Sequence, residues 1–344
     1  MPKIATLSHK FQIRVIDSQE AKRELVSEFM RRVKYSQIEY FNSMLRTIWE
    51  QTAEREARRE KLARVLALGA VFDSTLRVKA GAERLWSAFY SLSRDQRFIE
   101  ALRGAGESID AYALEQVQST IGPLAGVATS THIKHFTDFL STSDVDRNIA
   151  KWLSRFDCPI KCYRYLRESK LPFAESNKIG AMFIKYVGHR GVLPLPVEPV
   201  VDSWYPGHKR CFPILVDGHV VTFAMRTGLI NPEDIVQYPP VKSVEELWVF
   251  SSWGSVPSAV AYNGLVFDVL KQVSDDPALL DDYIFHFGKT ICVTHPRCSQ
   301  CQISDLCANS RTTGGKPESI AGFPAPPQRI RTQPKNLECM KDMD

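Results

Sequence analysis

The spacing of hydrophobic residues predicts helices through most of the chain. From residue 20 to residue 68, apolar side chains such as Leu25, Phe29 and Val33 recur at every third or fourth position between charged ones. This period matches one face of an α-helix. Residues 80–103 repeat the pattern until Gly104 interrupts it. The charged stretch at residues 54–64 predicts a solvated helical face.

The helical period continues in shorter pieces from residue 109 to residue 170, broken by Gly122-Pro123 and Cys158-Pro159. Strand-like alternation does not persist anywhere in the sequence, so we expect a mainly α fold. Residues 191–213 contain five prolines and predict a long irregular loop. Residues 310–344 are rich in proline, glycine and basic residues, which predicts a disordered tail.

Composition narrows the class of protein. The chain has 344 residues, of which 44% are hydrophobic and 24% charged, as in an ordinary globular protein with room for two helical layers. A net charge of +5 is compatible with a nucleic-acid partner without requiring one. Apolar runs fall short of the ~18–20 residues of a membrane helix, so we expect no membrane association. Of the eight cysteines, four lie in one compact run that predicts a metal centre and the others are scattered, and a metal centre together with free thiols favours a reducing cytoplasm.

Four cysteines near the C-terminus carry the strongest chemical signal. They form the run Cys-x5-Cys-x2-Cys-x5-Cys, which is Cys292, Cys298, Cys301 and Cys307. A zinc ribbon usually has two x2 knuckles, whereas one compact run of thiolates favours a [4Fe–4S] cluster. Zinc, and cysteines without a ligand, stay open as alternatives. The pair Cys158 and Cys162 has helical spacing but no visible partners, which predicts a structural role.

The residues around this run resemble the cluster loop of endonuclease III-type DNA glycosylases, a helix-hairpin-helix family. The resemblance lies in Phe287-Gly288-Lys289-Thr290-Ile291-Cys292, Pro296-Arg297-Cys298-Ser299-Gln300-Cys301 and Asp305-Leu306-Cys307. The family spaces its cysteines x6, x2, x5, so the first gap is one residue shorter here. It carries basic residues in this loop to the DNA backbone, which implies DNA contacts for Lys289, His295 and Arg297.

A second segment, Val216-Asp217-Gly218-His219-Val220 followed by Arg226-Thr227, resembles the family's Val-Asp-Thr-His-Ile…Arg-Thr motif. The family's catalytic aspartate matches Asp217. A carboxylate there would stabilise positive charge as the base–sugar bond breaks and would activate the attacking group. The alternative is an aspartate that only caps the following helix.

A weaker resemblance covers Leu171-Pro172-Phe173-Ala174-Glu175-Ser176-Asn177-Lys178-Ile179-Gly180-Ala181. In the family a glycine-containing hairpin here grips a DNA phosphate, and its lysine is the nucleophile of glycosylase/lyase members. Here Phe173 and Glu175 replace the glycines. Counted from Leu171-Pro172, the position of the family's lysine falls on Asn177. An insertion of one residue would place it on Lys178 instead. Asn177 is then an expected DNA contact. The alternative for Lys178 is an exposed lysine that begins a helix.

Trp204 and Tyr205 lie in the proline-rich loop. Their rings either wedge into a base stack or cap a flipped base, or they anchor the loop.

The resemblance implies a two-lobed helix-hairpin-helix glycosylase-like fold with a [4Fe–4S] cluster loop. Residues 1–104 would be a helical extension packing in part with the cluster lobe, residues 105–213 a helical barrel, residues 214–309 the catalytic and cluster lobe, and residues 310–344 the tail. The implied activity is that of a monomeric DNA glycosylase, with AP-lyase activity if Lys178 attacks C1′, acting on a base flipped from double-stranded DNA. Two alternatives remain: an N-glycosidase acting on a modified nucleoside, nucleotide or RNA, and a non-catalytic iron–sulfur protein that binds nucleic acid.

Overall fold

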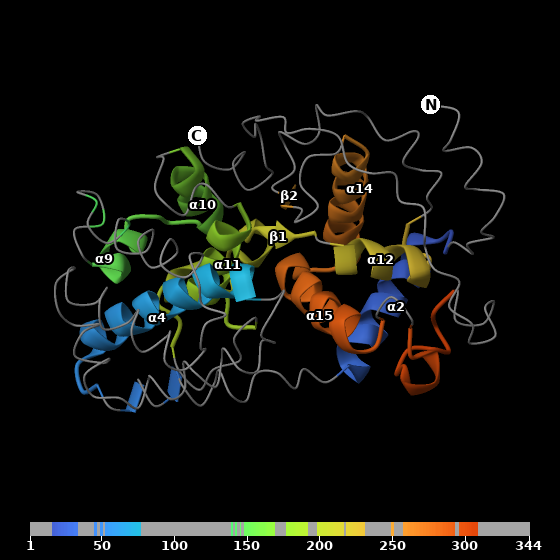
Figure 1. Ribbon diagram of the computed structural model, residues 1–344, viewed down its shortest axis with the longest axis horizontal. Coiled ribbons are helices and arrows are strands. Elements are labelled where there is room, and N and C mark those ends of the chain that lie inside the picture. Colours follow the sequence, from blue (N-terminus) through green and yellow to red (C-terminus); the bar gives the residue numbers. More distant parts are fainter. Residues whose placement is uncertain are drawn as a thin grey trace. The chain divides into compact units, whose positions relative to one another are not determined.

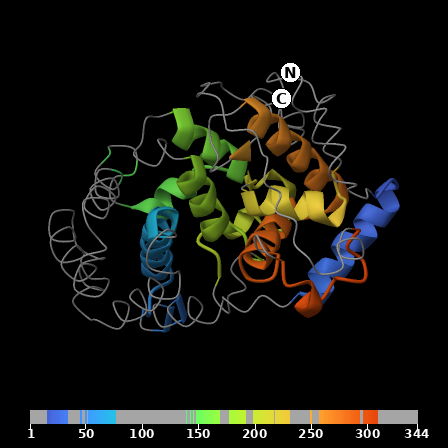
Figure 2. The same cartoon turned by 45° about the vertical axis from the view of Figure 1, so that its right-hand side comes forward.

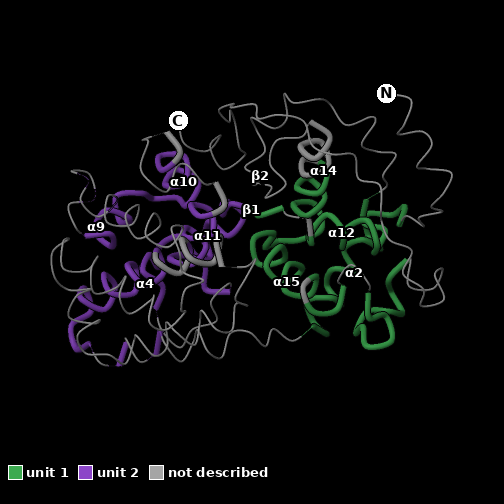
Figure 3. The backbone as a smooth tube through the Cα atoms, in the orientation of Figure 1, with its two compact units in different colours: residues 1–35, 214–344 green, residues 36–213 purple. Residues whose placement is uncertain are grey.

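The computed structural model divides into two compact units, residues 1–35 with 214–344 (unit 1) and residues 36–213 (unit 2), coloured separately in Figure 3. It describes residues 16–33, 45–46, 49–50, 52–76, 139, 142, 145, 148–168, 177–191, 198–216, 218–230, 249–250, 257–292 and 296–308. Within these ranges, side chains are not described at residues 68–69, 71–76, 167–168, 177–178, 218, 249–250, 257–264 and 289. The described part is mainly helical, as expected.

One unit boundary, 213/214, coincides with a predicted domain boundary. The other falls at 35/36 instead of 104/105, so the N-terminal stretch joins the C-terminal unit only as far as residue 35. The predicted helix at residues 80–103 and the predicted tail at residues 310–344 lie outside the described residues.

Unit 1 is built around helices α2 (Gln19–Arg32), α12 (Gly218–Thr227), α14 (Pro257–Val273) and α15 (Pro277–Thr290). Helix α12 packs against α14 and α15 (Figure 1). A short parallel pair, β1 (Ile214–Leu215) and β2 (Val249–Phe250), precedes α12 and α14 in the chain. The backbone N–H of Leu215 donates to the buried carboxylate of Asp281, which ties β1 to α15.

Helix α2 begins and ends through local signals. The side chain of Ser18 caps its first turn by accepting from the backbone N–H of Ala21 at 3.0 Å. It ends at Val33, whose backbone is extended, so the helix predicted through residue 68 is interrupted here. Its buried ring, Phe29, lies 4.8 Å from Phe223 of α12 and 5.2 Å from Phe287 of α15, measured between ring centroids. These three rings are buried together in the core of unit 1, whose helices Figure 2 shows from a second side.

A glycine permits the close approach of α12 to α15. A Cβ atom at Gly288 of α15 would lie 2.8 Å from the Cβ of His219 of α12, closer than carbon atoms tolerate. Gly288 therefore sets the distance between the two helices just before the cysteine run begins.

Unit 2 contains helices α4 (Arg55–Leu76), α9 (Ile149–Leu153), α10 (Pro159–Glu168) and α11 (Asn177–Gly188). Helix α11 packs against α4 and α10, and α4 also packs against α9. Its core includes Phe139, Trp152 and Phe183, all fully buried. The centroids of Phe139 and Trp152 lie 5.4 Å apart in an edge-to-face contact.

The charged face predicted for residues 54–64 is not simply solvated. Lys61 and Arg64 are buried, at 3% and 5% exposure. Arg64 pairs with Glu60 at 2.6 Å, and the other oxygen of Glu60 accepts from the backbone N–H of Ala150 at 2.8 Å. Ala150 lies in the first turn of α9, so the carboxylate of Glu60 accepts a hydrogen bond from a backbone N–H that has no partner within the helix. The same carboxylate neutralises the charge of the buried Arg64. The charges on α4 therefore hold α9 in place.

The same helix tethers the proline-rich loop. Arg59 of α4 pairs with Asp202 at 2.7 Å, and Arg55 pairs with Glu198 at 2.9 Å. The loop contains two 3-10 turns, η3 (Asp202–Trp204) and η4 (Lys209–Cys211), so its described part is more regular than the prolines predicted.

Candidate functional site

The C-terminal cysteine run folds as a loop that follows α15. Cys292 stands two residues beyond the helix, and its backbone N–H donates to the carbonyl of Phe287 at 3.0 Å. The N–H of Arg297 donates to the carbonyl of Ile291 at 2.9 Å, which brings the two sides of the first gap together. Cys298 and Cys301 bracket the 3-10 turn η5 (Cys298–Gln300). All four cysteines of the run are reduced and half-buried.

The four thiols lie close enough to influence one another electrostatically. The pKa of Cys301 is raised to about 11, mainly by burial and in smaller part by the charges of Cys307, Cys292 and Cys298, against a lowering hydrogen bond from the backbone of Ile303. Four thiols that disfavour one another's negative charge need a cationic centre to be thiolates together. The structure therefore places the four cysteines of the run near one another, and their role as metal ligands stays a prediction.

The spacing of these thiols is wider than that of a single-ion site. Among the described residues, no three of these four cysteines have their sulfur atoms within 4.8 Å of one another. One zinc ion with bonds of ~2.3 Å would hold its thiolates less than ~4 Å apart. A cubane cluster gives each thiolate its own iron and so holds the sulfurs farther apart.

Arg226, near the end of α12, connects that helix to the cysteine run. Its Nη1 donates to the carbonyl of Cys292 at 3.0 Å and lies 3.6 Å from the Sγ of the same residue. The thiol of Cys307 donates to the carbonyl of Arg226 at 3.3 Å. Burial raises the pKa of Cys292, while the hydrogen bond and charge of Arg226 oppose that rise. A guanidinium at this place stabilises negative charge on the sulfur atoms.

Helix α2 holds the other side of the loop. Arg32 pairs with Asp305 at 2.8 Å, between the third and fourth cysteines, and also with Glu28 of its own helix at 2.7 Å. Ile303 is buried, at 1% exposure. An N-terminal helix thus supports a C-terminal loop within unit 1.

The structure describes only part of the other residues of unit 1 that the sequence predicted to be functional. Helix α12 begins at Gly218, so Asp217 directly precedes it in the chain, but Asp217 itself lies outside the described residues. His295 lies outside them as well. Lys289 belongs to the last turn of α15, although its side chain is not described. Arg297 is exposed, which leaves it accessible to a partner.

In unit 2, Asn177 and Lys178 are the first two residues of α11, with side chains that are not described. The predicted hairpin before them, residues 171–176, lies outside the described residues.

The wedge role predicted for Trp204 is wrong in this arrangement, because its ring is fully buried. Its Nε1 donates to the carbonyl of Phe156 at 2.7 Å, and a Cβ atom added at Gly188 would lie 2.5 Å from the ring. Trp204 therefore anchors the proline-rich loop, the alternative that the sequence left open. Tyr205 is half-buried, with its ring centroid 4.8 Å from that of His189.

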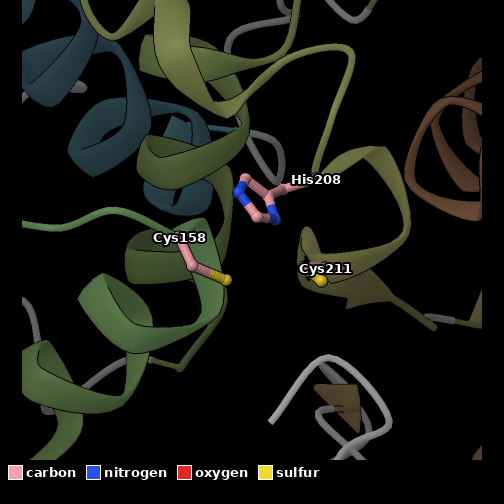
Figure 4. Close-up of side chains that lie close together, drawn as sticks. All are labelled: Cys158, His208 and Cys211. Atoms are coloured by element: carbon pink, nitrogen blue, oxygen red, sulfur yellow. The ribbon is translucent and has the colours of Figure 1, made fainter. Parts of the chain in front are cut away.

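Unit 2 also contains a group of ligand atoms that the sequence did not predict. The side chains of Cys158, His208 and Cys211 point toward a common space, with their ligand atoms within 4.8 Å of one another (Figure 4). Cys158 thus groups with residues of the proline-rich loop, and Cys162 is not a member of this group. The spacing His-x2-Cys at residues 208–211 was the available signal, but its partner lies in a distant part of the chain.

Comparison of the chain with known protein families, with curated proteins and with solved structures finds no match. Within the described ranges, none of the helices is both long and apolar enough to cross a membrane.

Proposed function

We propose that this chain is a [4Fe–4S] DNA glycosylase that hydrolyses the bond between sugar and base at a modified nucleotide flipped out of duplex DNA. The observation that carries the proposal is the contact of Arg226 with Cys292 and Cys307. Arg226 belongs to one segment that resembles the glycosylase family and the cysteines belong to another. Two separate sequence resemblances are thus parts of one local structure in unit 1.

The cysteine run would hold the cluster through Cys292, Cys298, Cys301 and Cys307. No three of their sulfur atoms lie within 4.8 Å of one another, which favours a cubane over one zinc ion. A bound cluster would stabilise the loop and present Arg297 to the DNA backbone. The base–sugar bond would be broken by the chain's own residues.

Asp217 would be the catalytic carboxylate. Loss of the base leaves positive charge on the sugar, and a fixed carboxylate beside it lowers the energy of that transition state. The same group would accept a proton from the attacking water. Asp217 directly precedes the first residue of α12, and Arg226 lies near the last residue of the same helix.

In unit 1, Lys289, His295 and Arg297 would contact the DNA backbone. In unit 2, Asn177 would be a separate DNA contact. Lys178 would attack C1′ if the enzyme also cleaves the strand. Its place in the first turn of α11 is compatible with that role and with the alternative of a helix-starting lysine.

The test measures base release from a panel of duplexes, each with one modified base, by wild type and by Asp217→Asn. The substitution removes the charge and preserves the size, so activity should drop by about 10²-fold or more, ~3 kcal/mol of transition-state stabilisation. The matched control is Asp202→Asn, because Asp202 is a carboxylate already paired with Arg59 and Arg55. It should keep near-wild-type activity.

Other results would point elsewhere. Loss of activity in Asp202→Asn with retention in Asp217→Asn would move the catalytic carboxylate to the proline-rich loop. Salt-dependent duplex binding without base release from any substrate would favour a binding protein. Base release from free nucleosides alone would favour the N-glycosidase. A covalent adduct trapped by borohydride and lost in Lys178→Gln would establish lyase activity.

A further inference from the structure

The group of Cys158, His208 and Cys211 is assembled from two segments of unit 2 that are distant in sequence. Cys158 directly precedes α10, while His208 and Cys211 lie in the turn that leads into and through η4. Both cysteines are buried, at 1% and 7% exposure, whereas His208 is half-buried. The site is therefore enclosed by protein on its sulfur side and accessible on its imidazole side.

The local backbone explains why His208 and Cys211 point the same way. The backbone N–H of Cys211 donates to the carbonyl of His208 at 2.8 Å. In a 3-10 turn with this hydrogen bond, residues three apart eclipse each other on one side. The turn is closed at its start by the N–H of His208, which donates to the carbonyl of Trp204 at 2.9 Å.

Trp204 brings this turn to Cys158. Its ring packs against Gly188 at the end of α11, and its Nε1 donates to the carbonyl of Phe156, two residues before Cys158. One buried residue thus joins the end of α11, the loop and the beginning of α10. The three ligand atoms converge because of this anchor.

We propose that Cys158, His208 and Cys211 bind a zinc ion. Two thiolates and a neutral imidazole match the divalent charge of zinc, so the bound site is electrically neutral, which suits its burial. Binding would release the two thiol protons to solvent. Sulfur and imidazole donors together favour zinc over the hard ions magnesium and calcium, which prefer oxygen.

The geometry needs only a small adjustment. Zinc bonds of ~2.0–2.3 Å hold ligand atoms roughly 3.3–3.8 Å apart, against the 4.8 Å within which these three lie. A closure of about 1 Å would complete the three bonds. Water entering on the side of His208 would occupy the fourth position.

The ion would act as a clamp. It would tie the proline-rich loop to the beginning of α10, next to the Trp204 anchor and in addition to the ion pairs of Asp202 and Glu198 with α4. Because α11 ends at the same anchor, the clamp would hold the α10–α11 pair at the end where α10 begins and α11 ends. This inference does not depend on the proposed glycosylase activity.

The experiment measures zinc and iron by mass spectrometry in full-length protein purified anaerobically, for wild type, His208→Ala, Cys211→Ala and Cys162→Ala. Cys162 is the matched control, a fully buried cysteine of α10 outside the group. Wild type and Cys162→Ala should contain about one zinc per chain, and the other two variants should lose at least about nine-tenths of it with iron unchanged. His208 is half-buried, so its loss should leave the fold intact.

A second measurement on wild type keeps the result clear if a variant does not fold. Chelation should expose Cys158 and Cys211 to alkylation, located by peptide mass spectrometry, and should lower Tm. Absence of zinc from wild type, equal zinc in wild type and His208→Ala, or a disulfide between Cys158 and Cys211 would each overturn the proposal.

Discussion

The two thiol sites of this protein are built in opposite ways. In unit 1, four cysteines lie within sixteen consecutive residues and one loop brings them together. In unit 2, Cys158 lies close to His208 and Cys211 although some fifty residues separate them, and the buried Trp204 helps to hold the two segments together. A contiguous run of ligand residues can be recognised in the sequence, whereas a site assembled by packing has no contiguous motif.

The sites also differ in what surrounds the sulfur atoms. The cysteine run has a guanidinium beside Cys292, spreads its thiols widely, and leaves them half-buried. The group in unit 2 is tighter, and its two cysteines are buried. Wide spacing suits a cluster with several metal atoms and tight spacing suits a single ion, so one chain would hold iron and zinc in separate units.

The largest expected effect tests whether the two sites are independent. Cys301→Ser removes one ligand of the run, so iron should fall from about four per chain toward zero, with loss of brown colour and of solubility. Zinc in unit 2 should remain. The measurement is metal and sulfide content after anaerobic purification, with Cys339→Ser as control because that cysteine lies outside the four-cysteine run in the sequence. Stoichiometric zinc without iron in wild type would contradict the cluster.

The next effect tests whether packing makes the site in unit 2. In Gly188→Ala the new Cβ would lie 2.5 Å from the ring of Trp204, so the ring must shift. We expect a destabilisation of about 1–3 kcal/mol and weaker retention of zinc against a chelator. Gly207→Ala, in the loop that contains Trp204, is the control, because its Cβ would meet nothing within 4 Å. Equal chelator sensitivity in the two variants would show that Trp204 does not support the site.

A smaller effect concerns the guanidinium of unit 1. Arg226→Gln keeps a hydrogen-bond donor near Cys292 but removes the positive charge. The reduction potential of the cluster should become more negative by on the order of tens of millivolts, because the positive charge stabilises the reduced, more negative cluster. Protein-film voltammetry measures the shift. Arg23→Gln, on α2, is the matched control, since that guanidinium donates to the carbonyl of Gln272 and is absent from the sulfur contacts described.

The smallest effect is a pH dependence at the contact of α2 with the run. Hydrogen bonds from Arg31 and then Arg32 lower the pKa of Glu28 from 4.5 to about 2. The folded pKa lies below the unfolded one, so this carboxylate contributes stability above pH 4.5 that is lost as the pH falls toward 2. The difference in Tm between wild type and Glu28→Gln should therefore be small at neutral pH and should vanish near pH 2. A difference that grows on acidification would contradict this assignment.

Much of unit 1 was predictable because its signals are local. The apolar period around Phe29 predicted a helix, and the cysteine spacing predicted a ligand group. The end of α2 at Val33 and the burial of Lys61 and Arg64 were not predictable from periodicity. A charged helical face looks solvated until a partner such as Glu60 and the N-terminus of α9 are placed against it.

The sequence by itself therefore determined the helical class and the four-cysteine run, because each rests on residues a few positions apart. The tertiary structure alone decided that only residues 1–35 of the N-terminal stretch join the C-terminal unit, that Trp204 is an anchor, and that Cys158 has His208 and Cys211 as neighbours. Those outcomes depend on which side chains share the same interior, and local spacing does not specify how distant segments pack.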